Sequence, residues 1–311
     1  MRRSVCILLF LLILHVVRAQ DGEETFIFLR YPASARAHAL GGDNVSVVEP
    51  DPSLAFHNPA LAGAEMDGMI NLGYMNFVAG IRLGSALYTR ALGEKGAWGV
   101  GARFISYGSF KQTTQENLTE GEFSVEDVSL SAFYSHDLSE RWRGGLSLKF
   151  LYSSMESYTS IGLAVDAGLS YYDRERAFSA GIALKHAGAQ LKAYYDQRQP
   201  LPWDLQAGIS KRLAHAPFRF SVTATYLTAW DFSRIGKHFV FGIEFLPSDN
   251  FWLGLGYNPK IQSDMKLQSG NSLGGFSAGG GIKIRTFDVG VSIARYHPSA
   301  LSLMLSLSTS L

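Results

Sequence analysis

The sequence predicts an all-β fold: a transmembrane antiparallel β-barrel of about 14 strands, preceded by an N-terminal hatch segment. Three observations support this prediction. Apolar residues recur at every second position along most of the chain. The alternating segments are roughly ten to twelve residues long, which is enough to cross a bilayer at a tilt. Aromatic residues also gather at the ends of these segments, as they do at the two membrane interfaces of a barrel.

The alternation is clearest in the stretch "GGLSLKFLYSSMESYTSIGLAVDAGLSYYD", residues 144–173. On a helix, residues two apart lie about 200° round the axis, so Leu146, Leu148 and Phe150 would point in different directions. On a strand they share one face, and Lys149 falls on the other face. The strand interpretation is therefore the better one, here and in the many similar segments.

A soluble β-sandwich would also alternate, with its polar residues facing water. Strand length and terminal aromatics favour the membrane barrel instead, and the non-apolar face is rich in Gly and Ser, as a packed or hydrated lumen would be. Lys149 and Asp166 are then expected to point into the lumen and to be solvated or paired there. Facing lipid at the midplane, a lysine would cost about 2–4 kcal/mol.

Fourteen segments follow the strand pattern, and an even number is typical of bacterial single-chain barrels. The predicted strands are 68–77, 80–91, 97–107, 125–137, 141–153, 161–173, 176–187, 201–212, 216–230, 237–247, 250–258, 274–285, 286–296 and 300–311. Short and long connections alternate between them. The long ones, 108–124, 188–200 and 259–273, are expected to face the cell exterior, since periplasmic turns are short.

Residues 1–19 are predicted to be a signal peptide, with two arginines, an apolar run and a small residue at Ala19. The alternative is an uncleaved anchor, although the run is short for a spanning helix. Removing 1–19 takes three arginines from the 28 basic residues, which leaves 25 against 27 acidic residues and a net charge of −2. It also removes Cys6, the only cysteine, so thiol catalysis and disulfides are excluded in the mature chain.

The segment 20–66 does not alternate, and the barrel is expected to occupy 67–311. "ASARAHAL" (33–40) predicts a short helix that ends at the following two glycines, and "PSLAFHNPALAG" (52–63) predicts a helical turn broken at Asn58-Pro59. The lumen of a 14-strand barrel is wide enough to need filling. We therefore expect 20–66 to fold inside the barrel as a hatch; the alternative is an arm in the periplasm.

No enzyme, metal or cofactor signature is present in the sequence. The histidines are spread singly over different segments, none with metal-pair spacing, and there is no G-x-S-x-G elbow. A Ser/His pair assembled from neighbouring strands remains an open alternative. No basic stripe indicates nucleic-acid binding. We expect a chain that is not an enzyme and binds no cofactor, no metal and no nucleic acid.

Three stretches resemble the PorV/PorQ family of outer-membrane barrels, which share the fold of the FadL fatty-acid channels. They are "FLRYPASARAHALGGDNVSVVEPDPSLAFHNPAL" (28–61), "LGYMNF" (72–77) and "HAPFRFSVTATYLTAWDF" (215–232); the last is similar to the PorQ branch. The resemblance implies an outer-membrane component of the type IX secretion system of Bacteroidota. It also implies a PorZ-like surface partner, in an attachment complex with PorU and PorV.

Two functions follow from this resemblance. The first is a non-enzymatic, monomeric barrel that acts as a scaffold and holds the surface partner through its long loops. Aromatic and long polar side chains suit such contacts, so Tyr194, Tyr195 and Arg198 in "KAYYDQRQP" (192–200) are the expected partner-binding residues. The alternative is a FadL-like channel for hydrophobic compounds, with the hatch as its movable part.

Overall fold

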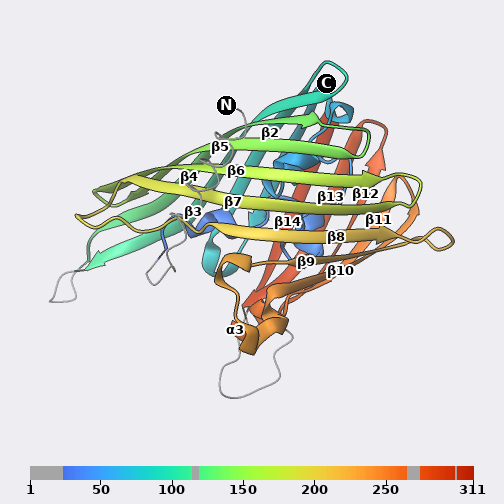
Figure 1. Ribbon diagram of the computed structural model, residues 1–311. Coiled ribbons are helices and arrows are strands. Elements are labelled where there is room, and N and C mark those ends of the chain that lie inside the picture. The colour runs from blue at the N-terminus through green and yellow to red at the C-terminus, as the bar shows by residue number, and fades with distance from the viewer. Residues whose placement is uncertain (1–23, 114–118, 265–273, 298–299) are drawn as a thin grey trace.

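The described residues form a closed antiparallel barrel around an N-terminal segment with several short helical turns (Figure 1). The computed structural model describes residues 24–113, 119–264, 274–297 and 300–311. The predicted signal peptide lies outside these residues, as do parts of the predicted loops 108–124 and 259–273.

Fourteen strands are described, as the sequence predicts, and each pairs with its neighbours in chain order. They are β1 (Met69–Asn76), β2 (Arg82–Leu92), β3 (Gly96–Thr113), β4 (Thr119–Asp137), β5 (Trp142–Met155), β6 (Tyr158–Asp173), β7 (Phe178–Lys192), β8 (Asp204–Arg212), β9 (Phe218–Ala224), β10 (Phe239–Ser248), β11 (Phe251–Tyr257), β12 (Phe276–Ile284), β13 (Phe287–His297) and β14 (Ala300–Ser310). Pairing of β1 with β14, from Met69 opposite Ser310 to Asn76 opposite Leu303, closes the ring.

The helical elements are short and lie before or between the strands. They are η1 (Ile27–Arg30), α2 (Ala35–Ala39), η2 (Pro52–Phe56), η3 (Pro59–Leu61), η4 (Ala64–Met66), η5 (Val78–Gly80), η6 (Leu227–Ala229), η7 (Phe232–His238) and α3 (Pro259–Asp264). Helices therefore occur at both places where the sequence predicts helical structure, 33–40 and 52–63, the second divided at Asn58. In the described parts of the chain, no helix combines the length and the apolar character that a membrane crossing requires.

Inward and outward faces alternate as expected. Leu148 on β5 is 56% exposed, whereas Lys149 beside it is 2% exposed, and Asp166 on β6 is also buried. The outward residues of the strands are large and apolar, which is the composition of a lipid-facing wall. The prediction that Lys149 and Asp166 point into the lumen is confirmed.

Several predicted strand ends are wrong. β3 and β4 continue through most of the predicted loop 108–124, because cross-strand pairs such as Phe110 with Phe123 extend the hairpin. β7 takes in 188–192 of the second predicted loop. The predicted strand 216–230 ends at Ala224, because Tyr226 adopts a left-handed conformation (φ 56°) and turns the chain into the connection 225–238.

The described part of the hatch lies inside the ring. α2 contacts β11–β14, whereas η3 contacts β4–β6 and η2 contacts β1 and β2, so the segment touches the wall on several sides (Figure 1). Most of its apolar side chains are buried.

Glycines in the wall make room for the hatch backbone. A Cβ atom added to Gly145 would meet the backbone at Pro59 and Ala60, and one added to Gly181 would meet the carbonyl oxygen of Val45. Both glycines face inward, on β5 and β7. At these two positions the hatch backbone lies directly on the wall, with no side chain between them.

Candidate functional site: the filled lumen and the extracellular surface

A buried polar cluster occupies the lumen at β5, β6 and β7. Lys149 on β5 forms an ion pair with Asp166 on β6 and lies 3.1 Å from Nδ1 of His186 on β7. His186 has a positive φ of 58°, at a bulge where the β6–β7 register shifts. Its backbone N–H donates to Oδ1 of Asp166 at 2.7 Å. Asp166 therefore stabilises both the lysine charge and the bulge.

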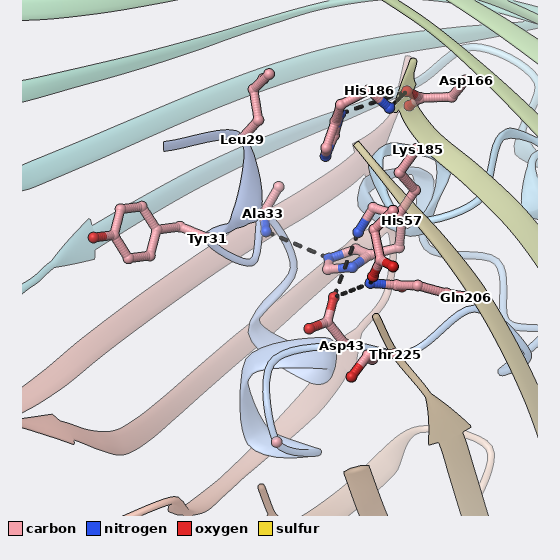
Figure 2. A network of polar contacts seen from close by, with 12 residues as sticks. Leu29, Tyr31, Ala33, Asp43, His57, Asp166, Lys185, His186, Gln206 and Thr225 are labelled. Carbon is pink, nitrogen blue, oxygen red and sulfur yellow. Dashed lines mark hydrogen bonds and ion pairs between the residues drawn. The ribbon is translucent and has the colours of Figure 1, made fainter. Parts of the chain in front are cut away.

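These contacts fix the proton positions on two histidines. A lysine ammonium is only a donor, so Nδ1 of His186 accepts from Lys149 and its proton is on Nε2. His57 of the hatch accepts the N–H of Ala33 through Nε2 at 3.4 Å. Its proton is therefore on Nδ1, and Figure 2 shows this ring extending toward Ala33.

Asp43 joins the hatch to two further strands. Its Oδ1 lies 3.4 Å from Nζ of Lys185 on β7 and accepts from Nε2 of Gln206 on β8 at 3.2 Å (Figure 2). The same Gln206 amide donates to Asp204 at 3.0 Å. The side chains that link hatch and wall here are charged or hydrogen-bonded, as buried polar groups require.

A second cluster joins the hatch to β9 and β10. Arg219 donates to Glu49 of the hatch and to Glu244 of β10, both at 2.6 Å. Arg36 of α2 lies 3.2 Å from Glu49 and stacks over the ring of Trp252. Burial alone would raise the pKa of Glu49, but Arg36 and Arg219 hold it below its ordinary value. Glu49 is therefore ionised at neutral pH.

Arg103 on β3 fixes the end of η1. Its guanidinium donates to the carbonyl oxygens of Phe28, Leu29 and Tyr31, at 3.3, 3.3 and 2.6 Å. All three carbonyls lie at or near the C-terminal, negative end of η1, where a helix lacks some of its backbone partners; that of Phe28 also accepts the N–H of Tyr31. A buried arginine on the wall thereby caps a helical turn of the hatch.

His38 of α2 reaches the other side of the barrel. Ser302 on β14 donates its hydroxyl proton to the carbonyl of Ala294, so it accepts from Nε2 of His38 at 3.0 Å. Nδ1 then accepts from Ser292 on β13 at 2.8 Å. Burial lowers the pKa of His38 to about 3, in agreement with this neutral form.

The contact between Ser302 and His38 is not that of a nucleophile with its base. The hydroxyl proton of Ser302 is already donated to a backbone carbonyl, and His38 donates to this serine instead of accepting from it, so it is no general base for it. Within the ranges that the structure describes, no three His, Asp or Glu side chains are placed to hold a metal ion. The arrangement is suited to holding the hatch in position.

Connection lengths distinguish the two ends of the barrel. The end where β1 begins and β14 finishes has the short turns, such as 93–95 and 249–250. The opposite end has the long connections 193–203, 225–238 and 258–275. Bacterial barrels place short turns in the periplasm and long loops outside, so the second end is extracellular.

At the extracellular end, the hatch and the β7–β8 connection cover the lumen together. The N–H of Thr25 donates to the carbonyl of Pro200 at 3.0 Å. Leu201 is buried in one apolar cluster with Phe26 and Phe28. This connection therefore helps to cover the extracellular end of the lumen and is also part of the extracellular surface.

The three expected partner-binding residues lie in this connection, but they differ in orientation. Tyr194 is half-buried and donates its hydroxyl to Ser153 on β5. Tyr195 is 64% exposed, with its ring 4.6 Å from that of Tyr158, and Arg198 is exposed. The structure thus leaves Tyr195 and Arg198 accessible and directs Tyr194 toward the wall. Partner binding by all three stays a prediction.

At the periplasmic end, a polar cavity of about 350 Å³ lies between the hatch and the wall. Its lining includes Asp51 and Glu65 of the hatch, Lys283 and Asp288 of the wall, and three serines of β14, Ser306, Ser308 and Ser310. Such a lining suits water and ions better than an apolar compound.

The sequence gives the secretion-system assignment. A model of the family "Type IX secretion system membrane protein PorP/SprF" matches residues 53–297. The chain belongs to the PorP/SprF family. It is an outer-membrane β-barrel of the type IX secretion system. The secretion system implied by the sequence resemblance is therefore confirmed. Membership of the PorQ branch stays a prediction, and no curated protein matches the chain in sequence.

Solved structures place the PorP/SprF family member in the FadL-like fold. The Ralstonia pickettii toluene transporter TbuX aligns with a TM-score of 0.58 at 12% identity, over 92% of this chain and all of that one. The Pseudomonas putida toluene transporter TodX gives 0.57 at 12%, over 90% and 98%. A Pseudomonas aeruginosa FadL homologue gives 0.54 at 10%, over 89% and 98%. At these identities the likeness concerns the fold alone.

The residues that hold the hatch are not among those predicted from the sequence. Arg103, Arg219 and Glu244 were not singled out, although the signal was present. Arg219 and Glu244 each stand between apolar neighbours in an alternating segment, the same signal that drew attention to Lys149 and Asp166.

Proposed function

We propose that this PorP/SprF family member is a non-enzymatic scaffold, of the PorQ type, in the outer membrane of a Bacteroidota cell. It holds a PorZ-like surface protein of the attachment complex, which also contains PorU and PorV. The observation that carries this proposal is the attachment of the hatch to the wall on several sides. A lumen filled in this way leaves the extracellular loops as the accessible working surface.

Within that surface, the β7–β8 connection is the first candidate. It rests on the hatch and is tied to it at Thr25, so its shape is supported from below. Tyr195 and Arg198 project from it, and residues of these types often anchor interfaces.

The test is affinity purification of the tagged barrel from solubilised outer membranes, with and without the double substitution Tyr195→Ala/Arg198→Ala. We expect the wild-type barrel to retain a surface protein and the double variant to lose it, while both stay heat-modifiable in gels. Arg174→Ala, in the exposed periplasmic turn 174–177, is the matched control and should retain the partner. Recovery of no partner, with secretion intact in a deletion strain, would refute the scaffold.

The second candidate is a channel for hydrophobic compounds, which the likeness to the toluene transporters favours. Such a channel needs an apolar path through the lumen. In the described residues the hatch is instead attached by Arg103, Arg219 and Lys185, and the periplasmic cavity is polar. Uptake of toluene into vesicles that contain the purified barrel, above the rate of empty vesicles, would support the channel and count against the scaffold.

A further inference from the structure

The barrel wall is short at two strands, β9 and β11. β9 and β11 have seven residues each, whereas β3 and β4 have 18 and 19. Seven residues at about 3.3 Å each, tilted by about 40°, rise only about 18 Å, and the apolar band of an outer-membrane barrel is about 25 Å tall. At β9 and β11, strands alone leave several ångströms of the band uncovered, whereas β10 between them has ten residues.

The connection that follows β9 has a fixed conformation. His238 donates through Nδ1 to the carbonyl of Thr225 at 3.0 Å and accepts the N–H of Asp231 through Nε2 at 3.0 Å. The ring of Trp230 stacks on His238 at 4.5 Å, and Asp231 caps η7 by accepting from Ser233. The segment is thus held by polar contacts at its base, near the ends of β9 and β10.

What this segment exposes is apolar. Phe232 is 83% exposed and Ile235 is 51% exposed, with the exposed Arg234 between them. Two large apolar side chains on an ordered loop are unfavourable in water, by about 25 cal/mol per Å² of apolar surface. A covering surface, either another protein or the membrane, would remove this cost.

A series of ring contacts connects this loop to the lipid-facing wall. Phe232 meets Trp230 at 6.2 Å, Trp230 meets Phe239 at 6.1 Å, and Phe239 meets Phe241 at 6.4 Å. Phe239 and Phe241 belong to the outward face of β10, whose alternate residues, such as Val240, are buried. The apolar surface of the loop is therefore continuous with the surface that the bilayer covers.

The charges around the loop fit a phosphate-bearing membrane surface. Arg234 and Lys237 lie on η7, and Lys260 lies on α3, which contacts η7 (Figure 1). Their acidic neighbours are Asp231, 3.8 Å from Arg234, and Asp264, which both lysines approach. These five groups carry one net positive charge.

We infer that the β9–β10 connection completes the lipid-facing surface where the wall is short. Phe232 and Ile235 enter the outer leaflet, and Arg234 and Lys237 lie at the level of the lipid phosphates. The occupant of this surface is phosphate-bearing lipid, and the loop is a membrane anchor outside the partner-binding surface. The inference goes beyond the scaffold function and does not depend on it.

The mature chain offers a clean test, because its only cysteine, Cys6, lies within the predicted signal peptide. Ile235→Cys carries a polarity-sensitive fluorophore, and the purified barrel is inserted into phosphatidylcholine vesicles whose acyl chains bear bromine near the headgroup. Ile243→Cys, on the outward face of β10, is the lipid-facing control. Asp196→Cys, exposed on the β7–β8 connection, is the water-facing control.

We expect the label at 235 to show blue-shifted emission and to be quenched by the brominated lipid, as at 243 and unlike 196. With lipid A added to the vesicles, the pair Arg234→Glu/Lys237→Glu should reduce this quenching. A label at 235 that behaves like the one at 196 overturns the inference, as does protection of that label only by added outer-membrane proteins. If Ile235→Cys fails to fold, intrinsic tryptophan fluorescence replaces the label. Quenching by brominated lipid that the wild type shows and Trp230→Phe lacks would report lipid contact at Trp230, which contacts Phe232 on the same loop.

Discussion

Arg219 on β9 donates to Glu49 of the hatch across a 2.6 Å hydrogen bond, and the same guanidinium binds Glu244 of the neighbouring strand. Replacing it by methionine leaves two carboxylates without their main partner. Because removal of one partner from a buried ion pair costs about 3–5 kcal/mol, Arg219→Met should lower the free energy of unfolding by that order. The free energy of unfolding is measured by titrating the barrel with urea and following the loss of the heat-modifiable, folded band in gels.

Arg212→Met is the matched control, at the end of the adjacent strand β8. Arg212 pairs with Asp249 at 3.7 Å where both side chains are exposed, and such a pair contributes about 0–1 kcal/mol. Similar midpoints for the two variants would show that the Arg219 cluster does not hold the hatch.

Lys149→Met should also destabilise the barrel, because Asp166 would stay buried with an uncompensated charge. The double variant Lys149→Met/Asp166→Asn should recover much of the loss. The side-chain amide oxygen of the asparagine introduced at position 166 can still accept the N–H of His186, so the bulge keeps its hydrogen bond. Guanidinium unfolding of the wild type, the single variant and the double variant checks this, and a double variant weaker than the single would contradict it.

Gly181→Ala should loosen the hatch, since the new methyl group meets the carbonyl oxygen of Val45. Overpacking of this kind typically costs about 1–3 kcal/mol. Limited proteolysis of the purified barrel, followed by mass spectrometry of cuts in 24–68, measures the exposure of the hatch. Gly84→Ala is the control, because nothing lies within 4 Å of its added Cβ, and it should leave the cleavage pattern unchanged.

Acid should weaken the same attachment through Glu49. Its pKa is lowered in the folded state, so its contribution is complete above the ordinary glutamate pKa and is lost as pH falls through the lowered folded value. Hatch cleavage by pepsin should therefore rise with falling pH in the acid range, and less steeply in Glu49→Gln. Identical slopes would assign the acid dependence to other carboxylates.

Most of the wall could be predicted from the sequence, because a strand in a lipid-facing wall records its two environments at alternate positions. Once Leu148 is assigned to the lipid face and Lys149 to the lumen, the alternation assigns every other side chain on β5 to one face or the other. The number of strands follows from counting such segments. Strand ends were less certain, because cross-strand pairing can continue through polar sequence, as it does at Phe110 and Phe123.

The attachment of the hatch could be predicted only in outline. An inward charge is visible in the sequence, but its partner depends on the stagger between strands and on the path of a segment that has no repeat. Nothing in the sequence around Arg103 indicates that its guanidinium donates to three backbone carbonyl oxygens near residue 30. The width of the lumen predicts that the hatch lies inside the ring, but the sequence does not show which wall residues it contacts.

The contact between His38 and Ser302 has a bearing on how the molecule is made. The two residues are 264 positions apart, and their contact joins α2 of the hatch to β14, the last strand. α2 also touches β11–β14, the strands that the ribosome delivers last. Closing the seam between β1 and β14 also encloses the hatch, because α2 contacts β13 and β14 on one side of the seam and η2 contacts β1 and β2 on the other. Ring closure and docking of the hatch are therefore coupled through long-range contacts, which are of the kind that slows folding.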